Sequence, residues 1–433
     1  MTSPSRETLE REMLELVGSL YPICRSITGD GVRETLRLVG EKIPLERHEV
    51  ASGTPVLDWT VPDEWNVRDA WIKNRAGERV VDFRRCNLHL VSYSEPVAPR
   101  WISRAELKEH LHSLPEHPDW IPYRTSYYKR TWGFCVSEKQ LESLTDPEYQ
   151  VCVDSTLAPG HLTYGEYFLP GERSDEILLS AHVCHPSLAD DNLSGIAVSS
   201  LVARALSARA RRRYSYRFLF IPGTIGSLTW LARNREGARR IRGGLTLVCL
   251  GDERGLTYKR TFGGRAEIDR AAQLALSASG RPFEAIDFFP YGYDERQFNS
   301  PGFRIPVGSL MRGRHGRFDE YHTSADDPRF VHGPQLVDAY DSVLAILDVL
   351  EGDARYRSLS PFGEPQLGRR GIYRAMGGES DPEALQLAML WVLSLADGEH
   401  TLVDAAERSG LGFAVVRSAA TLLERHDLIQ ECD

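Results

Sequence analysis

Hydrophobic and polar positions form two patterns along this chain, one typical of buried strands and one typical of helices. Together the two patterns predict an α/β fold. Four short runs rich in apolar residues have the length of buried strands in a parallel sheet. They are Ile177–Ala181, Tyr216–Ile221, Leu245–Leu250 and Arg304–Leu310. Helical spacing recurs around them, clearly in residues 196–206 and 334–350. Strands that alternate with helices favour a mixed, mostly parallel sheet with helices on both faces.

The pattern changes twice, which predicts additional domains. Between residues 56 and 130 it consists of short β-like runs separated by turn residues, as expected for a small inserted β domain. The larger domain would then comprise residues 1–55 and 131–352. Residues 352–380 are rich in Gly, Pro, Arg and Ser and predict a linker. A helix, a short helix, a Gly turn and a second helix in residues 378–433 outline a winged helix.

Composition narrows the class of protein. The 433 residues are 42% hydrophobic and 26% charged, which is ordinary for a soluble globular protein. Seven scattered cysteines without a CxxC pair do not suggest disulfides, so we expect a reducing, cytoplasmic setting. No apolar run approaches the length of a membrane span and the first residues do not form a signal peptide, so no membrane partner is expected.

The charge of the predicted winged helix argues against a nucleic-acid partner. From Gly378 onward, eleven acidic residues outnumber three basic ones, a net charge of −8 within a chain whose total is −9. A DNA-binding winged helix needs a basic face. We therefore expect a docking or dimerisation module, compatible with a homo-oligomer, and we disfavour the transcriptional regulator that the tail alone suggests.

The stretch from Glu176 to Gly195 carries the clearest chemical signal. Its apolar strand ends in His182, and Asp191 follows in a short loop before the next helix. Ligands of open α/β sheets bind at the carboxyl ends of strands, and His with Asp is a typical ligand set for a hydrolytic zinc. Each residue alone has an ordinary explanation, as a hydrogen-bonded core histidine or a helix cap. Their combination in one loop favours a metal site.

Two further predicted strands also end in residues that can bind a metal. Asp252 follows Leu245–Leu250, and His322 lies after Arg304–Leu310. The carboxyl ends of parallel strands share one edge of a sheet. We therefore expect these two side chains to meet those of His182 and Asp191.

These residues resemble those of the M28-type zinc aminopeptidases. A closer resemblance is to aminopeptidase-like proteins of uncharacterised function, with an inserted β domain of the DUF2172 type and a C-terminal winged helix of the DUF4910 type. It rests on residues 21–33, 182–195, 223–227 and 321–326. The resemblance covers nearly the whole chain and implies a zinc aminopeptidase or phosphorylase/hydrolase-like fold.

The resemblance also implies a role for each matching residue. His182 corresponds to a ligand of the first zinc ion, and Asp191 to the carboxylate that bridges two zinc ions. Asp252 corresponds to the second carboxylate on the first zinc, and His322 to a ligand of the second. The segment Tyr293–Phe298 stands where M28 enzymes have a segment close to the active site.

The chain departs from the M28 pattern at two places. M28 enzymes have a Glu-Glu pair after the strand that corresponds to Tyr216–Ile221, but residues 221–227 contain no carboxylate here. Cys184 replaces an Asp two residues after the first histidine. We therefore expect one zinc ion rather than two, held by His182, Asp191 and either His322 or Asp252, with His185 nearby.

The sequence leaves the other catalytic groups open. Glu295 is the first candidate for the general base, with Glu253 and Glu320 as alternatives. Substrate contacts are expected from Arg25, Ser26, Tyr321 and Arg312. The predicted activity is aminopeptidase-like hydrolysis of an amide bond in a short peptide or an amino-acyl small molecule. Because the Glu-Glu pair is missing, a non-catalytic binding protein on a degenerate peptidase fold is the alternative.

Overall fold

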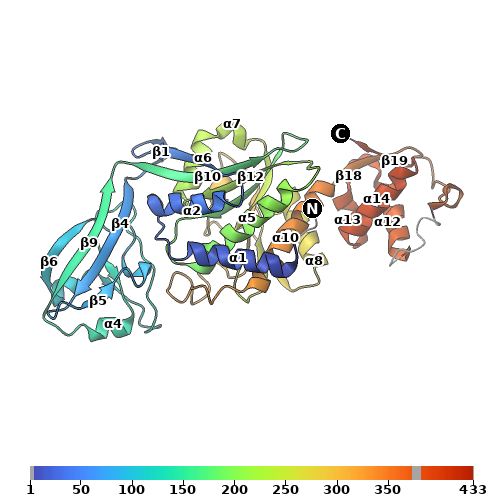
Figure 1. Ribbon diagram of the computed structural model, residues 1–433. Coiled ribbons are helices and arrows are strands. Elements are labelled where there is room, and N and C mark those ends of the chain that lie inside the picture. The colour runs from blue at the N-terminus through green and yellow to red at the C-terminus, as the bar shows by residue number, and fades with distance from the viewer. Residues whose placement is uncertain (1–3, 373–381, 433) are drawn as a thin grey trace. The chain divides into compact units, whose positions relative to one another are not determined.

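The computed structural model describes residues 4–372 and 382–432, and the chain forms two compact units. An eight-stranded mixed sheet, in the order β1-β10-β12-β11-β13-β16-β14-β15, forms the centre of the first unit (Figure 1). Strands β12, β11, β13 and β16 run parallel, whereas β1, β10 and β14 are antiparallel to their neighbours. The strands are β1 Glu46–Ala51, β10 His161–Leu169, β11 Glu176–His182, β12 Ser215–Ile221, β13 Ile241–Leu247, β14 Leu256–Lys259, β15 Phe283–Ile286 and β16 Val307–Met311.

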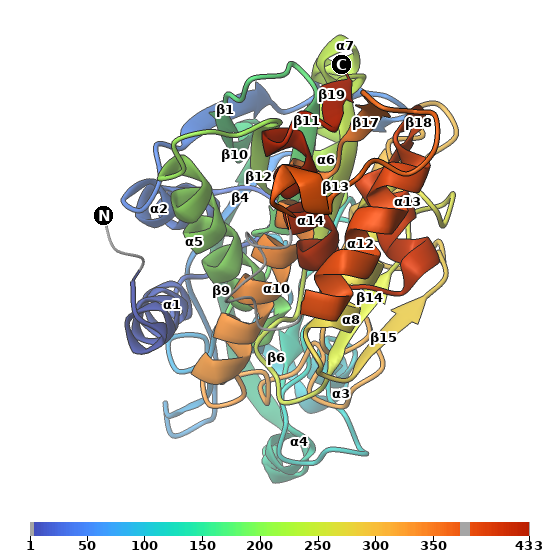
Figure 2. The ribbon, with the colours of Figure 1, turned by 90° about the vertical axis from the view of Figure 1, so that its right-hand side faces the viewer.

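Helices flank the large sheet and connect its parallel strands. Helix α5 follows β11 and leads to β12 on one side of it, and α6 and α7 lead from β12 to β13 on the other side. Crossovers between parallel strands are right-handed, and these two crossovers run in opposite directions along the sheet. Helix α5 therefore lies on one face of the sheet, and helices α6 and α7 lie on the other. Helices α1 and α2 lie on the same side as α5 (Figure 2). The helices are α1 Arg6–Leu20, α2 Asp30–Gly40, α5 Gly195–Ser207, α6 Ile225–Arg233, α7 Arg235–Ala238, α9 Glu295–Phe298 and α10 Gly333–Gly352.

The central strands confirm the prediction from the apolar runs. All seven residues of β11 and all seven of β12 are buried, as expected where helices cover both faces of parallel strands. Their register places His182 opposite Ile221 at the carboxyl ends. The predicted α/β architecture, with its mixed sheet and flanking helices, is therefore confirmed.

A second, four-stranded sheet in the order β5-β4-β9-β6 lies in the same unit (Figure 1). Strand β9 pairs with both β4 and β6, so this sheet extends beyond residue 130, where we expected the inserted domain to end. The hairpin β9–β10 carries the chain from the small sheet back to the large one. The strands and helices of this part are β2 Pro55–Val56, β3 Trp59–Thr60, β4 Glu64–Lys73, β5 Arg79–Asp82, β6 Val97–Ser103, α3 Arg104–Lys108, β7 Leu111–His112, β8 Phe134–Cys135, α4 Glu138–Ser143 and β9 Glu148–Ala158.

The second unit contains the winged helix. Thr401 caps α13 by accepting a hydrogen bond from Asp404 N, and the Asp404 carboxylate accepts one from Thr401 N, so the two residues satisfy each other's backbone donors. Strand β17, within the expected linker 352–380, pairs with β18 and β19; residues 373–381 lie outside the described part. The elements are α8 Glu267–Ala278, β17 Arg355–Ser358, α12 Pro382–Leu395, β18 Asp397–Thr401, α13 Leu402–Ser409, α14 Phe413–Arg425 and β19 Ile429–Cys432.

All seven cysteines are free, in agreement with the prediction that the fold does not depend on disulfides. Each helix in residues 4–372 and 382–432 is too short or too polar to span a lipid bilayer.

Candidate metal centre

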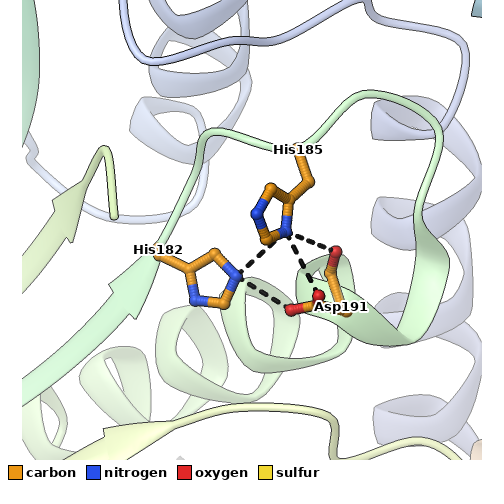
Figure 3. A group of neighbouring side chains, drawn as sticks. All are labelled: His182, His185 and Asp191. Carbon is orange, nitrogen blue, oxygen red and sulfur yellow. Dashed lines mark hydrogen bonds and ion pairs between the residues drawn. The ribbon is translucent and has the colours of Figure 1, made fainter. Parts of the chain in front are cut away.

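The candidate centre lies at the carboxyl end of β11, between the ends of β12 and β13. Strand β11 ends at His182, and the following loop carries His185. The turn Ala189–Ser194 then brings Asp191 close to both imidazoles (Figure 3). Neighbouring strands whose connections leave in opposite directions form the crevice in which open α/β sheets bind ligands.

The facing atoms of these three side chains are spaced like the ligands of one metal ion. His182 Nε2 lies 2.9 Å from Asp191 Oδ1 and 3.3 Å from His185 Nδ1. His185 Nδ1 lies 3.3 Å from Asp191 Oδ2. Ligand atoms about 2.0–2.1 Å from a tetrahedral zinc ion are about 3.3 Å from one another. The donor set and its spacing therefore fit a single zinc ion.

His322 lies against the same carboxylate from another loop. Its Nε2 atom is 3.0 Å from Asp191 Oδ2, yet within the described residues neither atom makes a hydrogen bond. The ring of Tyr123 packs edge-on against His185 and His322, and Tyr123 N donates to the carbonyl of His322 at 2.7 Å. Two buried polar atoms that face each other without a hydrogen bond suit a shared cation.

The protonation states of His182, His322 and Asp191 suit metal binding. Burial opposes protonation of His185, but the charge of Asp191 outweighs it and raises the His185 pKa well above its ordinary value, so this imidazole must release a proton when a metal binds. Burial lowers the pKa of His182 to about 4, although Asp191 opposes this shift, so His182 is the neutral imidazole that a metal requires. Burial also lowers the pKa of His322. For Asp191, burial opposes ionisation, but the positive charge of His185 and the hydrogen bond with His182 outweigh it and hold the pKa well below its ordinary value. The carboxylate is therefore anionic.

Two tyrosine hydroxyls and a histidine continue the network away from Asp191. Tyr293 Oη donates to Asp191 Oδ1 at 2.8 Å, and its ring stacks on that of His182 at 4.5 Å. Tyr321 Oη lies 3.3 Å from Tyr293 Oη and 3.2 Å from His315 Nδ1. Tyr321, expected as a substrate contact, thus belongs to this network. The sequence did not reveal His315, since it lies in a Gly- and Arg-rich loop without a motif.

None of the three candidate general bases contacts the three ligand side chains. Glu253 is exposed and lies 3.8 Å from His332. Glu295 is buried, its Oε1 atom lies 2.5 Å from Lys259 Nζ, and its Oε2 atom accepts a hydrogen bond from Tyr293 N at 3.0 Å. These contacts favour a positioning role for Glu295. Glu320 is half-buried and lies 3.4 Å from the guanidinium of Arg254. Among the described residues, Asp191 is the one acidic side chain that contacts the three histidines.

Asp252, which the sequence predicts as a metal ligand, instead accepts hydrogen bonds from the backbone of two loops. Its Oδ1 atom accepts a hydrogen bond from Arg254 N at 2.6 Å and its Oδ2 atom one from Gly313 N at 3.0 Å. The carboxylate therefore organises two loops and does not join the three ligands at the end of β11. Cys249, three residues earlier, contacts the network of the centre, because its Sγ atom is 4.0 Å from Tyr293 Oη.

The predicted substrate-binding arginines have structural roles. Arg312 is buried and donates to the carbonyls of Leu250 and Gln335 and to the carboxylate of Asp338, which leaves it outside the centre. Arg25 Nε donates to the carbonyl of His185 at 2.9 Å. Arg25 therefore positions a ligand.

Burial lowers the pKa of Arg25 to about 10, so the guanidinium remains charged at neutral pH. Ser26, which we also expected to contact substrate, is buried, with its hydroxyl 2.7 Å from that of Ser92.

The segment that lacks the Glu-Glu pair is nonetheless close to the centre. Gly223 N donates to Cys184 Sγ at 3.2 Å. The carboxylate that meets this segment comes from Asp294, whose Oδ1 atom accepts hydrogen bonds from Thr224 N and Ser227 Oγ. Asp294 therefore caps the start of α6.

A mixed sheet flanked by helices, with imidazoles and a carboxylate at the end of a central strand, places this chain among proteins with an aminopeptidase-like fold. Residues 14–353 match the family described as a domain of unknown function, DUF4910, and the chain belongs to this family. Residues 354–431 match a winged helix-turn-helix family. The prediction that the winged helix is of the DUF4910 type is wrong, because that match covers the preceding residues. The DUF2172 type stays a prediction.

Several known proteins share this architecture. A Clostridium acetobutylicum protein with the provisional name polysaccharide biosynthesis protein with aminopeptidase-like domain is 49% identical over 419 residues, which are 97% of this chain and 96% of that protein. The crystal structure of a provisionally named peptidase from the same organism matches with a TM-score of 0.93 and 47% identity, over 99% of this chain and 97% of that one.

More distant structures share the fold. A zinc aminopeptidase from Bacillus subtilis matches with a TM-score of 0.59 and 14% identity, over 80% of this chain and 95% of that one. A peptidase M28 precursor from Shewanella amazonensis matches with a TM-score of 0.56 and 12% identity, over 80% of this chain and 96% of that one.

Proposed function

We propose that this protein is a zinc-dependent hydrolase of amide bonds, aminopeptidase-like, that acts on a short peptide or an amino-acyl small molecule. The observation that carries this proposal is the convergence of His182, His185 and Asp191, whose ligand atoms all lie within 4.8 Å of one another. A zinc ion held there supplies Lewis acidity, which lowers the pKa of water and polarises an amide carbonyl.

The chain's own residues orient this chemistry. Asp191 presents one oxygen to His182 and the other to His185 and His322. Tyr293 Oη donates to the first of these oxygens and so holds the carboxylate in one orientation. Outer hydrogen bonds of this kind fix the direction of metal ligands.

Electrostatics favours one zinc ion over two. Two Zn2+ ions would bring four positive charges to a buried centre in which Asp191 is the one acidic side chain among the described residues that contacts the histidines. A buried charge of this size without compensation is unfavourable. A single ion held by neutral imidazoles and one carboxylate leaves a net charge of one.

The test is activity together with metal content. Purified protein loaded with zinc should release the amine from an amino-acyl anilide, and His182→Ala should lose both bound zinc and activity. His332→Ala is the control, because His332 is partly exposed and lies near Glu253. Equal activity of His182→Ala and the original protein would contradict the proposal.

Loss of the Glu-Glu pair favours a second candidate function, a binding protein without catalysis. In that case elemental analysis would find no stoichiometric metal, and no anilide would be cleaved.

A further inference from the structure

A cavity of about 390 Å³ adjoins the candidate metal centre. Tyr293 and His315 line it, and both belong to the hydrogen-bonded network that ends at Asp191. The cavity and the centre thus share a wall of two side chains. A substrate whose reacting bond lies at Asp191 has this space beside it for the rest of the molecule.

Two large aromatic side chains face solvent at this cavity. Phe289 is 59% exposed and Tyr291 is 60% exposed, and both line the cavity. Aromatic faces that remain in water at the edge of a cavity are typical of ligand sites.

A buried ion pair holds this aromatic platform in place. Lys259 and Glu295 are both buried, with Nζ and Oε1 2.5 Å apart. Lys259 Nζ also donates to the carbonyl of Phe289 at 2.9 Å and to that of Tyr291 at 3.1 Å. Glu295 accepts from the backbone of Tyr293. The pair therefore fixes the backbone of the platform and of the wall next to the metal centre, and a rigid, pre-arranged surface loses little entropy on binding.

The lining favours a sugar ring over other ligands. An apolar side chain would suit Phe289 and Tyr291 but not the charged side chains of Asp287, Arg314 and Arg317, which also line the cavity. A polyphosphate would suit Arg314 and Arg317, which also line the cavity, but not Asp287 and Glu295. A pyranose presents one face of C–H groups to an aromatic ring and a rim of hydroxyls that both donate and accept.

We infer that this cavity binds the sugar ring of an N-acylated amino sugar whose amide is hydrolysed at the candidate metal centre. The inference rests on the proposed amide hydrolysis and names its substrate class. In the reaction the C–N bond of the amide breaks. The hydroxyl of one water molecule joins the acyl carbon, and the remaining proton goes to the nitrogen, which gives a carboxylic acid and the free amino sugar.

Binding can be tested apart from catalysis by saturation-transfer NMR with N-acetylglucosamine and with glucosamine. Saturation should pass to the ring protons of both sugars. Phe289→Ala combined with Tyr291→Ala should weaken binding about tenfold, since two stacking faces are lost. Phe362→Ala is the matched control, because Phe362 is 98% exposed, does not line the cavity, and should leave binding unchanged.

Three results would overturn the inference: no transfer to either sugar, transfer that the double substitution does not change, or displacement of the sugar by phenylalanine amide at equal concentration. The last result would assign the cavity to an apolar side chain. If an amino-acyl anilide is cleaved but no sugar binds, the hydrolase proposal stands and the sugar inference falls. If sugars bind at the platform but neither the anilide nor N-acetylglucosamine is cleaved, the hydrolase proposal fails.

Discussion

Replacement of Tyr293 by Phe tests whether Asp191 is a metal ligand. The change removes the hydroxyl that donates to Asp191 Oδ1 at 2.8 Å and keeps the ring stacked on His182. Burial, together with the charge of Asp191, raises the Tyr293 pKa well above its ordinary value, so the hydroxyl is protonated and donates at every working pH. A hydrogen bond to a charged group contributes about 1.5–3 kcal/mol.

This magnitude agrees with a loss of about 10- to 100-fold in metal affinity, the usual effect of removing an outer partner of a ligand. Competition with a chelator of known affinity measures the zinc dissociation constant of each variant. Tyr321→Phe is the matched control, because its hydroxyl lies 3.3 Å from Tyr293 Oη and has no described contact with Asp191. Its zinc affinity should change less than that of Tyr293→Phe. Unchanged zinc affinity in a folded Tyr293→Phe protein would refute the assignment of Asp191 as a ligand.

Two further predictions concern other parts of the chain. Burial raises the pKa of Asp294 to about 6, so its contribution to stability is present below about pH 4 and is lost as the pH rises through 6, by up to about 3 kcal/mol. Asp294→Asn keeps an acceptor for Thr224 N and Ser227 Oγ and should be more stable relative to the original protein at pH 7 than at pH 4.5, as measured by urea unfolding; an equal difference at both values would contradict the shifted pKa. The winged helix should not retard duplex DNA in a low-salt gel shift, because its charge is −8 from Gly378 onward; a shifted band that weakens with added salt would show a phosphate contact.

The sequence predicted the central strands because their burial leaves little choice of residue. The apolar run before His182 can only be a buried segment, and the polar residues after it must lie at the sheet edge. This reasoning places His182 and Asp191 together, as the structure does. It also places His185 within reach, but only the path of the loop determines that its Nδ1 atom faces Asp191.

The same reasoning fails for Asp252 because a strand end predicts a region and not a side-chain direction. Strand β13 ends at Leu247, five residues before Asp252, and the intervening turn directs that carboxylate to Arg254 N and Gly313 N. An acidic residue close behind a strand can equally well satisfy the backbone donors of loops. The sequence does not distinguish the two roles.

Glu295 shows a further limit, because the sequence did not reveal the side chain with which it pairs. Lys259 lies 36 positions earlier and follows no motif, yet its ammonium group pairs with Glu295 in the buried floor of the cavity. A buried carboxylate paired in this way is unavailable as a base while the pair persists, since breaking it would leave an uncompensated charge. The pair instead connects the two halves of the proposed site: Lys259 holds the carbonyls of Phe289 and Tyr291, and Glu295 holds the backbone of Tyr293, whose hydroxyl orients Asp191. Sugar binding and metal binding would therefore depend on one buried contact.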